Sequence, residues 1–262
     1  DIGYHVENVI VEYCEIYGND NVQLYFANVK NCIARYNLIY GTVNGTGSGI
    51  VTGFERARDD YYYNGYVKIY GNLIANTDDN IWLRTQIANV NKHNEVYNNT
   101  LVEARRCAVR VAPNTGGGHI FKNNIIWQTD ADITNSVPAG AISNADYNLW
   151  SKIPHKRLIG THDPSYAVPK LIKTSGWNRL KSNGLLGKDF ALQKFSPAIG
   201  QGFPLNNIFN KMLDCDESQW PSKVVVVEKN KSNWDIGADN VSSSLSSSFL
   251  PPPSLQIVFN KN

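Results

Sequence analysis

Apolar and polar residues recur in a fixed order through the first 150 positions of the chain. Each repeat has one polar position, which we call the slot, with an apolar residue three positions before it and another two positions after it. The residue two positions before the slot is polar or amphipathic. Periods of this length are typical of repeat architectures. The slot is occupied by Cys14, Asn37, Asn72, Asn99, Asn124 and Asn148, at intervals of 23, 35, 27, 25 and 24 residues.

This order predicts two short strands joined by a bend close to the slot. Residues alternate between the two faces of a strand, so an inward residue on both sides of the slot requires a change of direction there. Asparagine tolerates the left-handed backbone of a tight turn, and we expect the slot residue itself to adopt it. In parallel stacked coils the asparagines would lie about 4.8 Å apart and bond to one another, which satisfies their buried amides.

A third strand precedes each pair, at 24–26, 51–53, 83–85 and 109–111. The 35-residue interval is explained by loops at GTVNGTGSG and FERARDDYYYNG, because stacked coils absorb extra length in loops on one side. Three short strands per coil predict an all-β fold, a single-stranded right-handed parallel β-helix over residues 1–150.

The regular repeat ends after Trp150. Residues 151–239 are expected to form an irregular connection, with prolines and glycines over 151–185, and a closing cap with a strand at Val224 to Val227. Residues 240–262 contain SSSLSSSFLPPP, which predicts a linker or tail. Self-association is expected through an open end of the β-helix or through this tail.

The repeat segments YCEIYGN, RYNLIYG, GNLIAN, NNTLV, NNIIW and DYNLW resemble those of the pectate-lyase-like superfamily. DFALQKFSPAIGQG at 189–202 and WDIGAD at 234–239 resemble the closing segment of many secreted bacterial β-helix proteins. The usual acidic residue of that segment is replaced here by Gly200 and Gln201. The resemblance implies an extracellular or cell-surface location and a polysaccharide partner, on a scaffold that carries enzymes, adhesins and structural proteins alike.

Charge and hydropathy narrow the classes of partner. Charged residues make up 18% of the chain and the formal net charge is +2, too small to favour nucleic acid or an anionic membrane. No apolar stretch approaches the 18 residues of a membrane span.

Candidate ligand-binding residues are those predicted to face outward on the first strand of each coil. Arg84 and Arg110 are expected to be neighbours on consecutive coils, where they would bind the carboxylates of an acidic polysaccharide. The simpler alternative is that nearby acidic residues neutralise both arginines in ordinary surface pairs. The predicted outward positions are Gln23, Tyr25, Ile50, Thr52, Trp82, Arg84, Ala108 and Arg110.

A lyase would need a neutralised uronate carboxylate and a base that removes the neighbouring proton. Arg84 and Arg110 are candidates for the first role, as is a Ca²⁺ ion held by Asp78 and Asp79. Candidate bases are Lys92, His93 and Tyr25, and the resemblance permits Lys92 because lyases on this fold often use a lysine or arginine base.

Two other classes remain open. Asn76-Thr77-Asp78 resembles the first acidic motif of polygalacturonases, but the carboxylate pair of a glycoside hydrolase is not found one coil later. The second class is non-catalytic, an adhesin or a structural or fibre element, since no complete catalytic set is present in the sequence.

Overall fold

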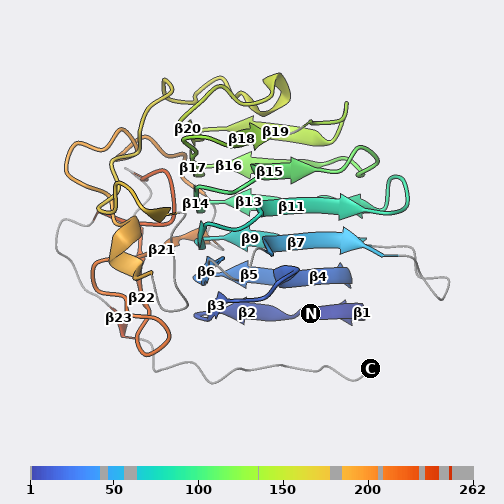
Figure 1. The fold of residues 1–262 in the computed structure, drawn as a ribbon, viewed down its shortest axis with the longest axis horizontal. Coiled ribbons are helices and arrows are strands. Elements are labelled where there is room, and N and C mark those ends of the chain that lie inside the picture. The colour runs from blue at the N-terminus through green and yellow to red at the C-terminus, as the bar shows by residue number, and fades with distance from the viewer. Residues whose placement is uncertain are drawn as a thin grey trace.

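The computed structural model is a parallel β-solenoid of about five turns with three sheets, which confirms the predicted fold class (Figure 1). It describes residues 2–41, 47–55, 64–134, 136–177, 185–205, 209–229, 234–241 and 248–249. Residues 42–46 of the predicted loop at 41–49, residues 56–63 of the predicted loop at 54–65 and most of the predicted tail lie outside these residues. Successive coils stack as nearly parallel layers, from β1 to β20.

Each coil contributes one strand to sheet B, one to sheet C and one or two to sheet A. Sheet A contains β1 (Ile2–Glu7), β4 (Val22–Lys30), β7 (Ser48–Phe54), β8 (Asn64–Gly65), β11 (Asp79–Thr85), β12 (Asn91–Lys92), β15 (Cys107–Val111) and β18 (Asp132–Thr134). Sheet B contains β2 (Ile10–Glu12), β5 (Ile33–Arg35), β9 (Lys68–Tyr70), β13 (Glu95–Tyr97), β16 (His119–Lys122) and β19 (Ile142–Asp146). Sheet C contains β3 (Glu15–Tyr17), β6 (Leu38–Tyr40), β10 (Leu73–Ala75), β14 (Thr100–Val102), β17 (Ile125–Trp127) and β20 (Leu149–Trp150).

The slot asparagines form a continuous buried ladder between sheets B and C, as predicted. Each side-chain amide donates to the carbonyl oxygen of the next asparagine, at 2.9, 3.0, 3.0 and 2.9 Å from Asn37 to Asn148. That same oxygen also accepts the backbone N–H of the preceding ladder residue. All five asparagines are fully buried, and no amide of the ladder lacks a partner.

The ladder begins and ends on residues other than asparagine. At the first coil the backbone N–H of Cys14 donates to the Asn37 side chain at 3.0 Å. At the last coil the Asp163 carboxylate accepts the backbone N–H of Asn148 at 2.8 Å, where the next asparagine oxygen would otherwise lie. Asp163 also accepts from the Trp150 indole and from the backbone N–H of Gly160.

The expectation that the slot residue adopts the left-handed conformation was wrong. The ladder asparagines have negative φ, and the left-handed residue is the one before each of them. The slot residue must direct its N–H and its amide along the stack, so the bend falls one position earlier. These positions are Tyr13, Tyr36, Gly71, Asn98, Asn123 and Tyr147, with φ of 60°, 55°, 64°, 49°, 56° and 58°.

The predicted register of sheet A was also wrong. Leu24 pairs with Ile50, Ile50 with Ile81, and Ile81 with Val109. Ile50 and Thr52 therefore point inward, and Val51 lies between them on the outer face. The connection from sheet A to the next slot differs in length from coil to coil, so counting back from the slot does not give the register of these strands.

The inward residues of all three sheets form one apolar core inside the solenoid, and a second core lies outside it. In the second core, residues 151–239 pack against sheet C and part of sheet B, along one side of the stack (Figure 1). Tyr70 and Tyr97, each two positions before its slot, are buried there against Phe209.

The segment that follows the coils begins at the end of the stack and then turns along its side. Its first short helix, η1 (Lys156–Leu158), packs on β19, and Leu158 enters the solenoid core. Farther on, η3 (Gly187–Phe190) precedes an antiparallel sheet of β21 (Lys211–Leu213), β22 (Val225–Glu228) and β23 (Ser248–Phe249). The predicted strand at Val224 to Val227 corresponds to β22.

Four cysteines, Cys14, Cys32, Cys107 and Cys215, are free thiols. Among the described residues, no helix has the length and apolar character that a membrane span requires.

A second buried polar network lies at the corner between sheets A and B. The Asn64 amide donates to Asn91 at 2.9 Å, and Asn94 donates to the same oxygen at 2.6 Å. In the next coil of this second network, His119 replaces an asparagine as acceptor. Its Nδ1 accepts the backbone N–H of Asn94 at 3.2 Å. The ring proton therefore lies on Nε2, which faces the Thr115 hydroxyl at 3.2 Å.

Asn99→Ala tests the ladder at its middle. The change removes the acceptor for two N–H groups of Asn72 and the donors to Asn124 and Ile69. We expect the free energy of unfolding to fall by about 3 kcal/mol or more, since several buried groups lose their partners. Urea denaturation measures the loss. Asn114→Ala, at an exposed position, serves as the control, and an equal loss in both variants would contradict a special role for the ladder.

The pH dependence of stability tests the His119 position. Burial, and then the neighbouring His93, lower the pKa of His119 to about 4. The folded protein therefore resists protonation of this ring, so its contribution to stability is present above about pH 6.5 and is lost as the pH falls towards 4. The loss amounts to about 3 kcal/mol over that interval. His119→Asn keeps an amide at this position of the buried network but has no ring to protonate. When both proteins are denatured in urea from pH 7 to 4, the variant should lack this pH-dependent loss of stability. Parallel pH profiles for the two proteins would refute it.

Candidate functional site

The outer face of sheet A carries a strip of aromatic and cationic side chains. Trp82 on β11 pairs in register with Val51 on β7 and with Arg110 on β15. A small apolar cluster of Tyr25, Ala27 and Val51, with Val22 and Trp82 at its edge, lies beneath this strip and is separate from the solenoid core. The strip is therefore presented on a rigid surface of parallel strands.

Arg84 and Arg110 do not face each other across consecutive coils, which corrects the sequence-based expectation. Arg84 pairs in register with Gly53, two residues away from the pair that Trp82 makes with Arg110. The Trp82 ring contacts both cations, at 5.3 Å from the Arg84 guanidinium and 4.3 Å from that of Arg110. Both are cation–π contacts.

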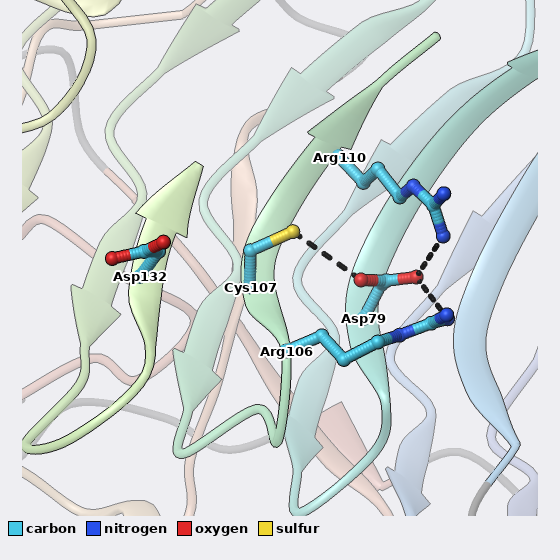
Figure 2. Close-up of a pocket in the computed structure, with 5 residues that line it drawn as sticks. All are labelled: Asp79, Arg106, Cys107, Arg110 and Asp132. Carbon is cyan, nitrogen blue, oxygen red and sulfur yellow. Dashed lines mark hydrogen bonds and ion pairs between the residues drawn. The ribbon is translucent and has the colours of Figure 1, made fainter. Parts of the chain in front are cut away.

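An open pocket of about 210 Å³ lies beside this strip, where β11, β15 and β18 begin. It is lined by Asp79, Arg106, Cys107, Arg110 and Asp132. Figure 2 shows both guanidiniums converging on Asp79 from one side, with Asp132 at the opposite end, beyond Cys107. In the sheet, Cys107 is the register partner of both aspartates, which places them two strands apart, about 10 Å.

Asp79 is the fixed centre of the pocket. Its side chain is fully buried, and its Oδ2 lies 2.6 Å from Arg106 and 3.4 Å from Arg110. The Ser48 hydroxyl donates to the same oxygen at 3.4 Å, and the Cys107 thiol donates to Oδ1 at 3.2 Å. Four groups, from β7 and from β15 and its start, therefore hold this carboxylate in place.

The pocket carries a surplus of positive charge at its arginine end. Arg106 and Arg110 retain 51% and 32% of their side-chain exposure, and one buried carboxylate lies between them. Two cations against one anion leave about one net charge facing solvent, in a geometry suited to a carboxylate or phosphate.

Arg84 belongs to a different, balanced cluster. Its guanidinium lies 3.0 Å from the Glu55 carboxylate and 3.3 Å from the Tyr25 hydroxyl, which itself donates to Glu55 at 3.0 Å. Burial raises the pKa of Tyr25, so the phenol remains protonated as a donor. For Arg84, this pairing corresponds to the simpler alternative considered from the sequence, in which a nearby acidic residue neutralises the arginine.

Other residues predicted to bind substrate have local partners. The Gln23 amide is buried and exchanges hydrogen bonds with the backbone of Asn19 at 2.9 and 3.2 Å. Tyr25 is buried with its hydroxyl in the Glu55 cluster, and Trp82 is half-buried beneath Arg110. Of these three residues, Trp82 is the one that contacts a pocket arginine, Arg110.

Of the three candidate bases, Tyr25 contacts Arg84, whereas Lys92 and His93 lie farther away. The strand β4 serves as a common reference for the two positions. Lys92 is in register, through Gly65, with Lys30 of β4. Arg84 is in register, through Gly53, with Ala27 of β4. Lys92 is therefore about three residues farther along the coil, up to about 10 Å. His93 follows it at the corner, where its ring stacks on Tyr66 at 5.1 Å.

The predicted calcium ligands each face an arginine. Asp78 lies 3.9 Å from Arg105, and Asp79 is held by the two pocket arginines. Burial raises the pKa of Asp78, an effect that Arg106 and Arg105 oppose. Within the part of the chain that is described, no group of three or more His, Cys, Asp or Glu residues could hold a metal. Calcium binding here remains a prediction from the sequence.

Three pocket residues were absent from the sequence-based set of candidates, namely Arg106, Cys107 and Asp132. Arg106 immediately precedes β15, and alternation along that strand does not report on it. The adjacent pair Arg105-Arg106, one coil after Asp78-Asp79, was the signal available in the sequence.

Comparison with protein-family models and with curated proteins gave no match. The assignment of function therefore depends on the geometry of the site.

Removal of the buried carboxylate tests the architecture of the pocket. Asp79→Ala leaves Arg106 and Arg110 without their anion and deprives Ser48 and Cys107 of an acceptor. We expect the free energy of unfolding to fall by about 2–4 kcal/mol, because a charge network with a buried partner is broken. Glu55→Ala, which breaks a half-exposed pair, should cost less than about 1 kcal/mol. Urea denaturation of both variants provides the comparison, and the reverse order of losses would contradict this account.

Proposed function

We propose that the protein binds an acidic polysaccharide through Arg106 and Arg110, without cleaving it. The observation that carries the proposal is the convergence of these two arginines on one side of an open pocket, with a single buried carboxylate between them. A planar anion of the ligand would take the guanidinium N–H groups that point away from Asp79.

The fixed geometry of the two arginines supports binding. Arg106 uses Nη2 and Arg110 uses Nη1 on Asp79. The Trp82 ring supports the Arg110 guanidinium from one face at 4.3 Å. An arginine whose plane is already fixed loses less entropy when it binds an anion.

Binding without cleavage is favoured by what surrounds the arginines. A lyase needs a base within hydrogen-bond reach of the substrate proton. The described residues that line the pocket contain no lysine, histidine or tyrosine, and the candidate Lys92 lies farther along the coil. Asp79 is occupied by four partners and is not available as a base.

We place the protein in the pectate-lyase-like superfamily and at the cell surface or outside the cell as part of the same proposal. Support comes from the three-stranded coils, the asparagine ladder and the closing segments at 189–202 and 234–239, whose likeness to secreted bacterial β-helix proteins was described above. Self-association stays a prediction from the sequence.

Binding assays on a uronate polymer test the proposal. Arg106→Gln with Arg110→Gln should weaken binding of polygalacturonate by at least about tenfold, since each change removes charge-assisted hydrogen bonds. Lys188→Gln removes one positive charge from η3, in the side segment away from sheet A, and should have little effect. Binding by the unchanged protein should weaken with added salt.

The same samples distinguish binding from cleavage. Prolonged incubation should produce no ultraviolet absorbance from unsaturated uronate, and no new reducing ends. Equal binding by the double arginine variant and by Lys188→Gln would refute the assignment of the pocket, and product formation would refute the absence of cleavage.

A further inference from the structure

We infer that Asp79 determines the charge selectivity of the arginine pocket, so that the pocket favours singly charged anions over doubly charged ones. This inference rests on the proposed function, because it concerns the ligand that the same arginines would bind. It adds a role for the carboxylate that pairs with both arginines.

The first step is that Asp79 is a permanent counter-ion. Its carboxylate contacts both guanidiniums, at 2.6 Å and 3.4 Å, and is fully buried. Because Ser48 and Cys107 also donate to it, at 3.4 Å and 3.2 Å, it cannot turn away when a ligand arrives. One of the two positive charges is therefore cancelled before any ligand binds.

The second step concerns the charge that remains. A singly charged carboxylate balances the surplus of about one unit, whereas a phosphate monoester carries nearly two negative charges at neutral pH. The second charge of the phosphate would meet a buried carboxylate instead of a free cation. Selectivity of this kind arises from repulsion of the unwanted ligand as well as attraction of the favoured one.

Asp132 provides a natural comparison within the same pocket. It carries the same charge as Asp79, but it is exposed and lies at the far end of the pocket, beyond Cys107. Among the ion pairs found in the described part of the chain, none joins Asp132 to either arginine. Asp132 lies about 10 Å from Asp79. At physiological salt, solvent screens most of the repulsion that Asp132 would exert on an anion bound beside Asp79.

Competition between two matched sugars tests the inference. Galacturonate and galactose 6-phosphate share a ring and carry their anionic group at the same end. Each is used at pH 8 to displace labelled polygalacturonate from the folded protein. Galacturonate should compete at least as well as the phosphate against the unchanged protein.

In Asp79→Asn, a neutral residue of the same shape, the phosphate should gain about fivefold relative to galacturonate, because its second charge now meets an uncompensated arginine. In Asp132→Asn the ratio should change by less than about twofold. Circular dichroism checks that each variant is folded.

The outcomes separate the inference from the function on which it rests. If the unchanged protein does not bind polygalacturonate, both the proposed function and the inference are overturned. A second outcome would overturn the inference alone. In it, binding still depends on Arg106 and Arg110, but galactose 6-phosphate and galacturonate compete in the same ratio in Asp79→Asn and Asp132→Asn. If Asp79→Asn does not fold, the unchanged protein still decides, since preference for galactose 6-phosphate over galacturonate would be incompatible with a charge-cancelling Asp79.

Discussion

The structure depends on one requirement, that the ladder asparagines placed inside the coils must find hydrogen-bond partners there. The five ladder asparagines meet this requirement through side-chain bonds of about 3 Å, and their oxygens also accept backbone N–H groups. A ladder residue therefore bonds in two directions along the stack, which fixes the register of sheets B and C coil by coil. This register is kept although the interval between ladder asparagines varies from 24 to 35 residues.

The same requirement explains why the two outer surfaces differ. Sheets B and C are held closely in register, and the side segment covers sheet C with a second apolar core. Sheet A is tied to the ladder through connections of unequal length. Asp79 is the first residue of β11, and Arg106 directly precedes β15. Charged side chains from the starts of two neighbouring strands thus meet at one edge of a regular surface.

The sequence was sufficient for the architecture and insufficient for the pocket. The spacing of Asn72, Asn99 and Asn124 predicted the ladder because its hydrogen bonds connect equivalent positions. The register of sheet A could not be predicted in this way, and Ile50 and Arg110 were placed against the wrong neighbours. The pairing of Arg84 with Glu55 and Tyr25 depends on contacts between residues about 30 positions or more apart. Arg106 was missed because it lies before its strand, where alternation carries no information.

Asp163 also has a consequence for how such a chain can change in length. Its carboxylate accepts the last N–H of the column but, when ionised, offers no donor to a further layer. Tandem duplication of an internal layer, such as the one that begins at Asn99, would keep the column intact. A layer inserted after Asn148 would separate this terminal carboxylate from the N–H it accepts, so Asp163 sets the point at which the stack stops growing.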